Sequence, residues 1–83
     1  MVITTVARDP SFEKILSKLD QHQKEKIKKQ LLKIIKDPQT GKPMRYARNG
    51  TREVYIRPFR LSYAYIPEEQ KIIFLDIYHK DEQ

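Results

Sequence analysis

The sequence has no cysteine, no tryptophan, two histidines and two glycines. Without thiols the chain can form neither a disulfide framework nor a thiolate zinc site, and two imidazoles are few ligands for a structural metal. Two glycines also cannot build the glycine-rich loops that hold phosphate groups, and no serine-hydrolase, Walker or zinc-protease motif is present. The composition therefore predicts a protein without a cofactor and without a bound metal.

Long hydrophobic runs are missing as well. No apolar stretch approaches the ~20 residues that cross a bilayer, and residues 1–7 lack the basic start and apolar run of a signal peptide. We expect a cytoplasmic protein that does not enter membranes. With 83 residues, of which 39% are hydrophobic, the chain can build one core, so we expect a single domain over residues 1–83.

The first half of the chain predicts a strand followed by helix. Residues 2–6 are β-branched throughout, which favours a short strand. Asp9 and Ser11 flank Pro10 with the chemistry of a helix start. Two groups of apolar residues then follow the helical i, i+3, i+4, i+7 spacing. They are Phe12, Ile15, Leu16 and Leu19, and then Ile27, Leu31, Ile34 and Ile35.

The helical region is expected to be divided. Residues 20–26, between the two apolar groups, contain no large apolar side chain, which predicts a break and a helical hairpin. One bent helix is the alternative. The region should end at Asp37-Pro38, because proline cannot continue the helical hydrogen bonds and disfavours helix in the residue before it.

The second half changes to a period of two, which is typical of strands. Two alternating runs, over residues 53–57 and 60–65, are joined by a tight turn at residues 58–59. A longer turn at residues 67–70 leads to a last strand over residues 72–78. These three strands should be adjacent and antiparallel.

The order of these elements predicts an α+β fold. It consists of an N-terminal strand, a two-helix hairpin and then an antiparallel β-meander forming one small sheet, with the helices packed on one face. Residues 44–47 are the candidate for one more strand.

The net charge of +6 is unevenly distributed. Eight of the eleven lysines lie in the predicted helices, whereas five of the six arginines lie between positions 45 and 60. Residues 42–60 carry six basic side chains against one acid, Glu53, and seven of the eight aromatic residues lie in the C-terminal half. Guanidinium groups that bind phosphate are thus interleaved with rings that stack on bases, which predicts a site for single-stranded nucleic acid.

The tyrosines divide into two groups. Tyr63 and Tyr65 share the alternation of Leu61, so we predict both in the core. Tyr55 and Tyr78 are candidates for stacking on bases, with a half-buried position in the sheet as the alternative. The predicted nucleic-acid-binding residues are Arg45, Arg48, Arg52, Tyr55 and Tyr78. The lysine-rich helices are typical of a solvated face, although an acidic partner could use them.

His79 is the candidate for proton transfer near neutral pH, because it stands directly before Lys80 in a region with little else apolar. An exposed histidine without a role is the alternative. No spacing among the acidic residues of the second half suggests a carboxylate cage for magnesium. Metal-dependent cleavage of phosphodiesters is therefore not expected.

Several short motifs occur in order along the chain. They are Asp37-Pro38, Gly41-Lys42-Pro43-Met44-Arg45, Glu53-Val54-Tyr55-Ile56-Arg57, Phe59-Arg60-Leu61-Ser62-Tyr63 and Tyr78-His79-Lys80. Together they resemble the RelE/ParE superfamily of toxin-antitoxin toxins over nearly the whole chain. The resemblance implies the strand, helical hairpin and meander already predicted. It also implies cleavage of messenger RNA, which many members carry out in the ribosomal decoding site.

The same resemblance implies four catalytic residues. Arg60 would stabilise charge on the scissile phosphate, Arg57 and Lys80 would add positive charge, and His79 matches a histidine before the closing basic residue. The implied reaction is attack of a ribose 2′-hydroxyl on its own phosphate, which needs no metal. Fixed cations can stabilise the pentacoordinate state, and His79 can contribute proton transfer.

The implied partners are a cognate antitoxin, messenger RNA and the ribosome. The superfamily also contains gyrase poisons, so the alternative is a non-catalytic inhibitor that binds a protein target such as DNA gyrase. A plain RNA-binding module is the third interpretation. Arg60 and His79-Lys80 at one sheet end would favour the enzyme, and their separation on opposite faces would favour the binding functions.

Overall fold

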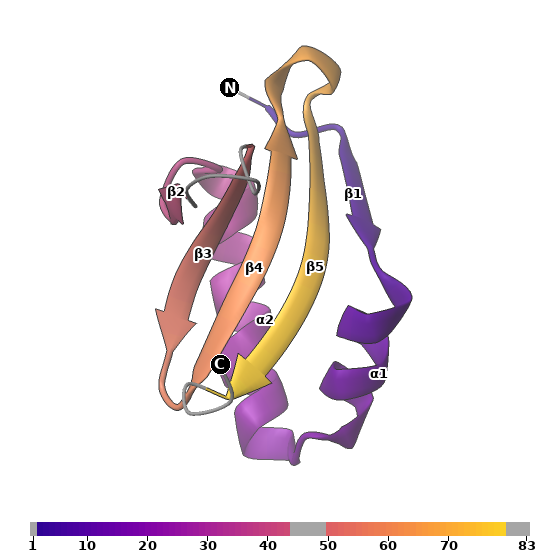
Figure 1. Cartoon of the computed structure of the whole chain (residues 1–83), viewed down its shortest axis with the longest axis vertical. Coiled ribbons are helices and arrows are strands. Elements are labelled where there is room, and N and C mark those ends of the chain that lie inside the picture. Colours follow the sequence, from indigo (N-terminus) through magenta and orange to yellow (C-terminus); the bar gives the residue numbers. More distant parts are fainter. Residues whose placement is uncertain (1, 44–49, 80–83) are drawn as a thin grey trace.

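The chain runs through a strand, two helices and four further strands in a computed structural model that describes residues 2–43 and 50–79 (Figure 1). The short 3-10 helix η2 (Pro67–Glu69) precedes the last strand. Within these residues no helix is both long enough and apolar enough to cross a membrane. The main elements are β1 (Thr5–Arg8), α1 (Pro10–Lys18), α2 (Gln21–Lys36), β2 (Lys42–Pro43), β3 (Thr51–Ile56), β4 (Phe59–Ile66) and β5 (Lys71–His79).

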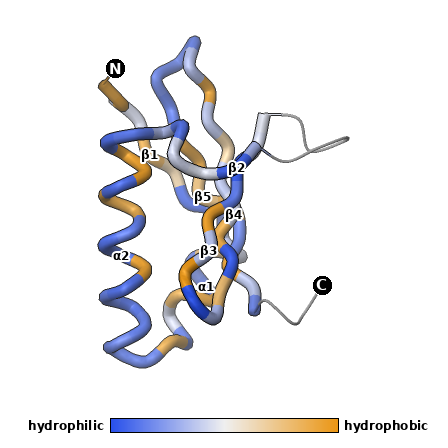
Figure 2. Tube along the Cα trace, turned by 90° about the vertical axis from the view of Figure 1, so that its left-hand side faces the viewer, coloured by the Kyte–Doolittle hydropathy of each residue, from blue (hydrophilic) through white to orange (hydrophobic). Residues whose placement is uncertain are grey.

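The strands form one mixed sheet with the order β1-β5-β4-β3-β2. β3, β4 and β5 make an antiparallel meander, and β1 lies parallel to β5 at the sheet edge (Figure 1). Helix α2 runs along one side of this sheet (Figure 2). The predicted α+β fold, with its N-terminal strand, helical hairpin and meander, is confirmed.

The first strand lies later in the chain than predicted. β1 covers Thr5–Arg8, whereas the β-branched composition pointed to residues 2–6. The Thr4 amide donates to the carbonyl of Gln70, the last residue before β5, at 2.9 Å. The ladder with β5 begins at the pair of Thr5 and Lys71. Pairing with β5, and not residue composition, therefore sets the boundaries of β1.

Two aspartates fix the starts of the helices. The Asp9 carboxylate accepts a hydrogen bond from the Ser11 amide at 3.0 Å, and that of Asp20 accepts from the Gln23 amide at 2.8 Å. Hydrogen bonds from the Ser11 amide and hydroxyl hold the pKa of Asp9 below its usual value. The predicted hairpin is confirmed, because α1 and α2 are separate helices, and α2 ends before Asp37-Pro38 as expected.

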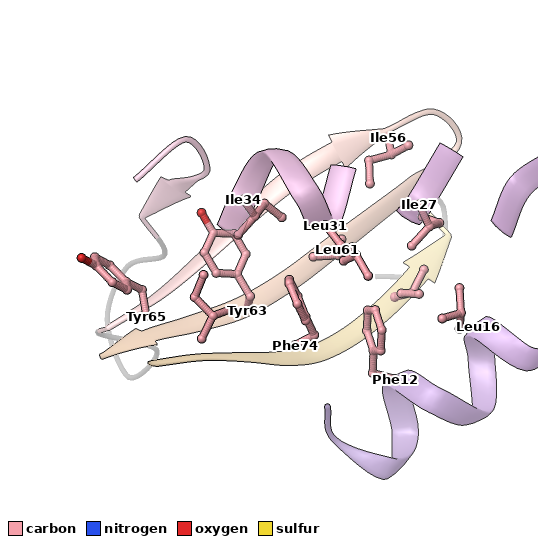
Figure 3. Packing of buried hydrophobic residues seen from close by; sticks show 12 residues of the cluster. Phe12, Leu16, Ile27, Leu31, Ile34, Ile56, Leu61, Tyr63, Tyr65 and Phe74 are labelled. Carbon is pink, nitrogen blue, oxygen red and sulfur yellow. The ribbon is translucent and has the colours of Figure 1, made fainter. Parts of the chain in front are cut away.

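The core lies between the helices and one face of the sheet (Figure 3). Phe12 of α1 stacks on Phe74 of β5 with ring centroids 5.5 Å apart, and Phe74 contacts the Tyr63 ring at 6.3 Å. Tyr63 and Tyr65 are both buried, which confirms their predicted core positions. Further core residues are Leu16, Ile27, Leu31, Ile34, Ile56, Leu61, Ile72 and Ile77.

The loop after α2 is tied to β3 and β4 by side chains. The Tyr63 hydroxyl donates to the Pro38 carbonyl at 2.7 Å and accepts from the Gly41 amide at 3.0 Å. Arg52 Nη1 donates to the carbonyls of Gln39 at 3.1 Å and Gly41 at 2.6 Å. A Cβ atom at position 41 would lie 2.8 Å from the Tyr63 hydroxyl oxygen, so this close approach requires glycine.

Candidate active site on the open face of the sheet

Three of the predicted site residues form a row across the meander. Tyr55 of β3 is the register partner of Arg60 of β4, which is in turn the partner of Tyr78 of β5. A direct neighbour of each of these residues on its strand, Ile56, Leu61 or Ile77, belongs to the core. Helix α2 runs along the core side of the sheet (Figure 2). Successive side chains of a strand point to opposite faces, so the row lies on the face opposite the core. We name this side, with Glu53, Tyr55, Arg60 and Tyr78, the open face.

Glu53 connects two members of this row. Arg60 Nη1 donates to Glu53 Oε1 at 3.1 Å, and the Tyr78 hydroxyl donates to Glu53 Oε2. The side chains of Arg60 and Glu53 are 33% and 17% exposed, so the ion pair is shielded from water only in part. Burial, followed by the hydrogen bond to Glu53, raises the pKa of Tyr78 above the ordinary tyrosine value of 10.0.

A pocket of about 520 Å³ opens beside this cluster. Glu53, Tyr55 and Arg60 line it together with Lys42 of β2 and Gln30 of α2. Tyr55 is 52% exposed, and Arg60 Nε is a buried donor without a hydrogen-bond partner among the described residues. Residues 2–43 and 50–79 contain no cluster of three His, Asp or Glu side chains arranged as metal ligands. The pocket thus offers a guanidinium, an ammonium, a carboxylate and an aromatic ring to a ligand.

His79 lies at the same end of the sheet as Arg60 but on the opposite face. Its register partner is Phe59, and the two rings make an edge-to-face contact with centroids 6.0 Å apart. Arg60 directly follows Phe59 and Tyr78 directly precedes His79, so the two pairs point to different faces. The structure therefore brings Arg60 and His79 to one end of the sheet without bringing their side chains together.

The other predicted site residues are placed as follows. Arg57 is exposed in the turn between β3 and β4, and its carbonyl accepts a hydrogen bond from Lys26 Nζ of α2 at 2.8 Å. Arg52 is engaged with the carbonyls of the loop after α2. The predicted site residues outside the described part of the chain are Arg45, Arg48 and Lys80, and the candidate strand 44–47 also lies there.

Glu53 is the site residue that the sequence patterns did not single out. Its one distinguishing feature in the sequence was that residues 42–60 contain six basic residues and a single acidic residue, Glu53. A signal was nevertheless present, because the period of two places Glu53 on the same strand face as Tyr55. The missing information was the register of β3 against β4, which decides that the carboxylate meets Arg60.

Comparison with known proteins identifies the family. Residues 6–83 match the family model of the ParE toxin of type II toxin-antitoxin systems, parDE. The chain belongs to this toxin family. It is also 33% identical over 76 residues to the toxin candidate RelE4 of Methanocaldococcus jannaschii, which covers 87% of this chain and 81% of that protein. The resemblance to the RelE/ParE superfamily is thereby confirmed.

Solved structures of ParE/RelE toxins share the fold. The RelBE2 toxin-antitoxin complex of Mycobacterium tuberculosis contains a chain with a TM-score of 0.83 and 24% identity, over 99% of this toxin and 97% of that chain. Isolated RelE of Escherichia coli gives a TM-score of 0.79 at 19% identity, over 95% of this toxin and 86% of RelE. The RelE-RelB complex of Pyrococcus horikoshii gives a TM-score of 0.77 at 11% identity, over 99% and 100%. Because these sequence identities are low, the similarity to the solved structures shows that the fold is shared and shows nothing further.

Proposed function

We propose that this toxin is a metal-independent endoribonuclease that cleaves messenger RNA in the cytoplasm and thereby inhibits translation. The observation that carries the proposal is the pocket beside the open face, which Lys42, Arg60 and the exposed residue Tyr55 line together. A guanidinium can bind a phosphate through two hydrogen bonds, and an exposed ring can stack on an unpaired base. The pocket volume of about 520 Å³ falls in the range of small-ligand sites.

The proposed reaction is attack of a ribose 2′-oxygen on the adjacent phosphate, giving a 2′,3′-cyclic phosphate and a free 5′-hydroxyl. Its transition state carries more negative charge on the phosphate oxygens than the substrate does. Arg60 is held on β4 beside the pocket, so its charge needs little rearrangement to stabilise that state. Arg57, His79 and Lys80 remain predicted catalytic contributors. The predicted RNA contacts are Arg45, Arg48, Arg52, Tyr55 and Tyr78.

A cognate antitoxin and the ribosome complete the proposal. The solved relatives from Mycobacterium tuberculosis and Pyrococcus horikoshii are toxin-antitoxin complexes. We infer that an antitoxin neutralises this toxin by covering the open face, and the net charge of +6 favours an acidic partner. The ribosome would present the message to the pocket as a single strand.

The proposal is tested by incubating the toxin with a defined message, free or on translating ribosomes, and mapping the new 5′ ends. We expect discrete cuts that Arg60→Ala abolishes. Arg8→Ala is the matched control, because Arg8 is an exposed arginine of β1 that pairs with Glu13 at 3.6 Å, away from the pocket. His79→Ala tests its predicted contribution in the same assay. Cleavage that survives Arg60→Ala would contradict the proposal.

A non-catalytic inhibitor of a protein such as DNA gyrase is the second candidate. Two observations favour it: a carboxylate already pairs with Arg60, and His79 does not line the pocket. A supercoiling assay with purified gyrase separates the candidates. Inhibition of supercoiling together with intact RNA would replace the nuclease by the inhibitor.

A further inference from the structure

Cleavage by a 2′-hydroxyl needs a group that accepts the hydroxyl proton, and His79 is not among the residues that line the pocket. Among the described residues that line the pocket, Glu53 is the one that carries a carboxylate. We propose that Glu53 is the general base of the reaction and therefore a catalytic residue. This inference rests on the proposed ribonuclease function and names the residue that begins its chemistry.

The geometry fits this role because base and cation must act on neighbouring atoms. The attacked phosphate and the attacking 2′-oxygen belong to one nucleotide, so a group that holds the phosphate must lie beside the base. Arg60 Nη1 and Glu53 Oε1 are 3.1 Å apart. Arg60 can therefore hold a phosphate oxygen while Glu53 faces the adjacent hydroxyl.

The carboxylate is held in place by its two partners and retains the capacity to act. Arg60 donates to Oε1 and the Tyr78 hydroxyl donates to Oε2. Each carboxylate oxygen has two lone pairs, so either oxygen can accept a further hydrogen bond from a 2′-hydroxyl. The substrate thus need not displace Arg60 or Tyr78 before proton transfer.

The proposed step balances without a metal or a cofactor. The 2′-oxygen forms a bond to phosphorus while its proton passes to a Glu53 carboxylate oxygen. The bond between phosphorus and the 5′-oxygen of the next nucleotide breaks, and that oxygen takes a proton from water. Glu53 then returns its proton to the solvent, so the products are the 2′,3′-cyclic phosphate and the 5′-hydroxyl.

A purely structural role of Glu53 makes different predictions. If the carboxylate only oriented Arg60, its neutralisation would loosen Arg60 and weaken RNA binding and cleavage together. If it is the base, neutralisation removes a negative charge beside the phosphate site, which favours RNA binding, while the chemical step slows. Binding and single-turnover cleavage therefore have to be measured separately.

The test compares the wild-type toxin with Glu53→Gln, Glu53→Asp and the control Asp76→Asn. Asp76 is also an acid on the meander, but its Oδ1 accepts from the Ile77 amide at 2.9 Å and it does not line the pocket. The substrate is an RNA that the wild type cleaves, on ribosomes if required. The binding probe is the same RNA with deoxyribose at the cleaved nucleotide, and circular dichroism verifies folding.

We expect Glu53→Gln to bind this probe at least as tightly as wild type and to cleave about 10²- to 10⁴-fold more slowly. Its rate should also lose the decline at acidic pH that protonation of a carboxylate base produces. Glu53→Asp should retain part of the rate, and Asp76→Asn should match wild type. The inference is supported by this split between binding and rate.

Three results would overturn it in distinguishable ways. Cleavage by Glu53→Gln at the wild-type rate would remove Glu53 from the reaction and leave the ribonuclease function standing. A parallel loss of binding and cleavage in Glu53→Gln would reduce Glu53 to a support for Arg60. Intact RNA with the wild-type toxin, free and on ribosomes, would remove the proposed function and this inference together.

Discussion

The two faces of the sheet use the same side chain in different ways, as Tyr63 and Tyr78 illustrate. Tyr63 is buried beneath the helices, and its hydroxyl bonds to the backbone of Pro38 and Gly41. Tyr78 is partly exposed on the open face, and its hydroxyl bonds to the carboxylate of Glu53. The first hydroxyl fixes the main chain, whereas the second belongs to a cluster of ionisable side chains.

This difference indicates how a chain of 83 residues separates stability from function. The backbone bonds of Tyr63 can be broken only by opening the loop after α2. On the open face, Arg60 can gain or exchange a partner by a side-chain movement while the backbone stays in place. We name the side of the sheet that packs against the helices, with Leu61, Tyr63 and Phe74, the covered face. Substitutions on the covered face should therefore lower the free energy of unfolding, and those on the open face should change binding and activity.

The largest effect is expected for Phe74→Ala on the covered face. Phe74 has no exposed surface and lies between the rings of Phe12 and Tyr63. Removing it leaves a cavity, so the free energy of unfolding should fall by about 3–5 kcal/mol, measured by urea denaturation. Tyr55→Ala on the open face is the comparison and should change stability by roughly 0.5 kcal/mol or less. Similar losses for both variants would contradict the division between the faces.

Most of the architecture could be predicted because it depends on local patterns. Apolar spacing located the two helices, Asp9 and Pro38 marked their ends, and alternation placed Tyr63 and Tyr65 in the core. The boundaries of β1 could not be predicted, because they are set by pairing with β5. That contact joins residues far apart in the sequence and has no local signal.

The site was less predictable for the same reason. Alternation correctly grouped Tyr55 with one strand face, but the row from Tyr55 to Arg60 and Tyr78 depends on the registers of two strand pairs. Those registers also decide that Glu53 meets Arg60 and that His79 does not. Composition identified a basic region. The ion pair between Arg60 and Glu53 within it could be recognised only in the folded structure.

A smaller effect is expected at the joint between the covered face and the loop after α2. In Gly41→Ala the new Cβ atom would lie 2.8 Å from the Tyr63 hydroxyl oxygen and 3.0 Å from the Glu53 carbonyl oxygen. The overlap should lower the free energy of unfolding by about 1–3 kcal/mol. The same substitution in a Tyr63→Phe background should cost less, because the nearest atom is gone. If the two changes in the free energy of unfolding were strictly additive in this double-mutant cycle, the new Cβ atom and the Tyr63 hydroxyl would not be in steric conflict.

The smallest effect is the response of the two tyrosines to alkaline pH. Burial raises the pKa of Tyr63 and also that of Tyr78, to which the hydrogen bond with Glu53 contributes. A raised pKa means that the folded state keeps a proton that the unfolded state has already lost. The stability that each hydroxyl contributes is therefore complete below the ordinary tyrosine value of 10.0 and declines as the pH rises above it.

Urea denaturation between about pH 8 and 11 measures this decline for the wild type and for the Tyr63→Phe and Tyr78→Phe variants. Each variant should lose stability less steeply with pH than the wild type, because it lacks one titrating hydroxyl. Adding Glu53→Gln should reduce the part that belongs to Tyr78, since the acceptor charge is removed, and leave the part of Tyr63 unchanged. A variant curve that stays parallel to the wild type would show that its hydroxyl does not resist ionisation in the folded state. For Tyr78, that result would mean that the contact with Glu53 does not hold in solution.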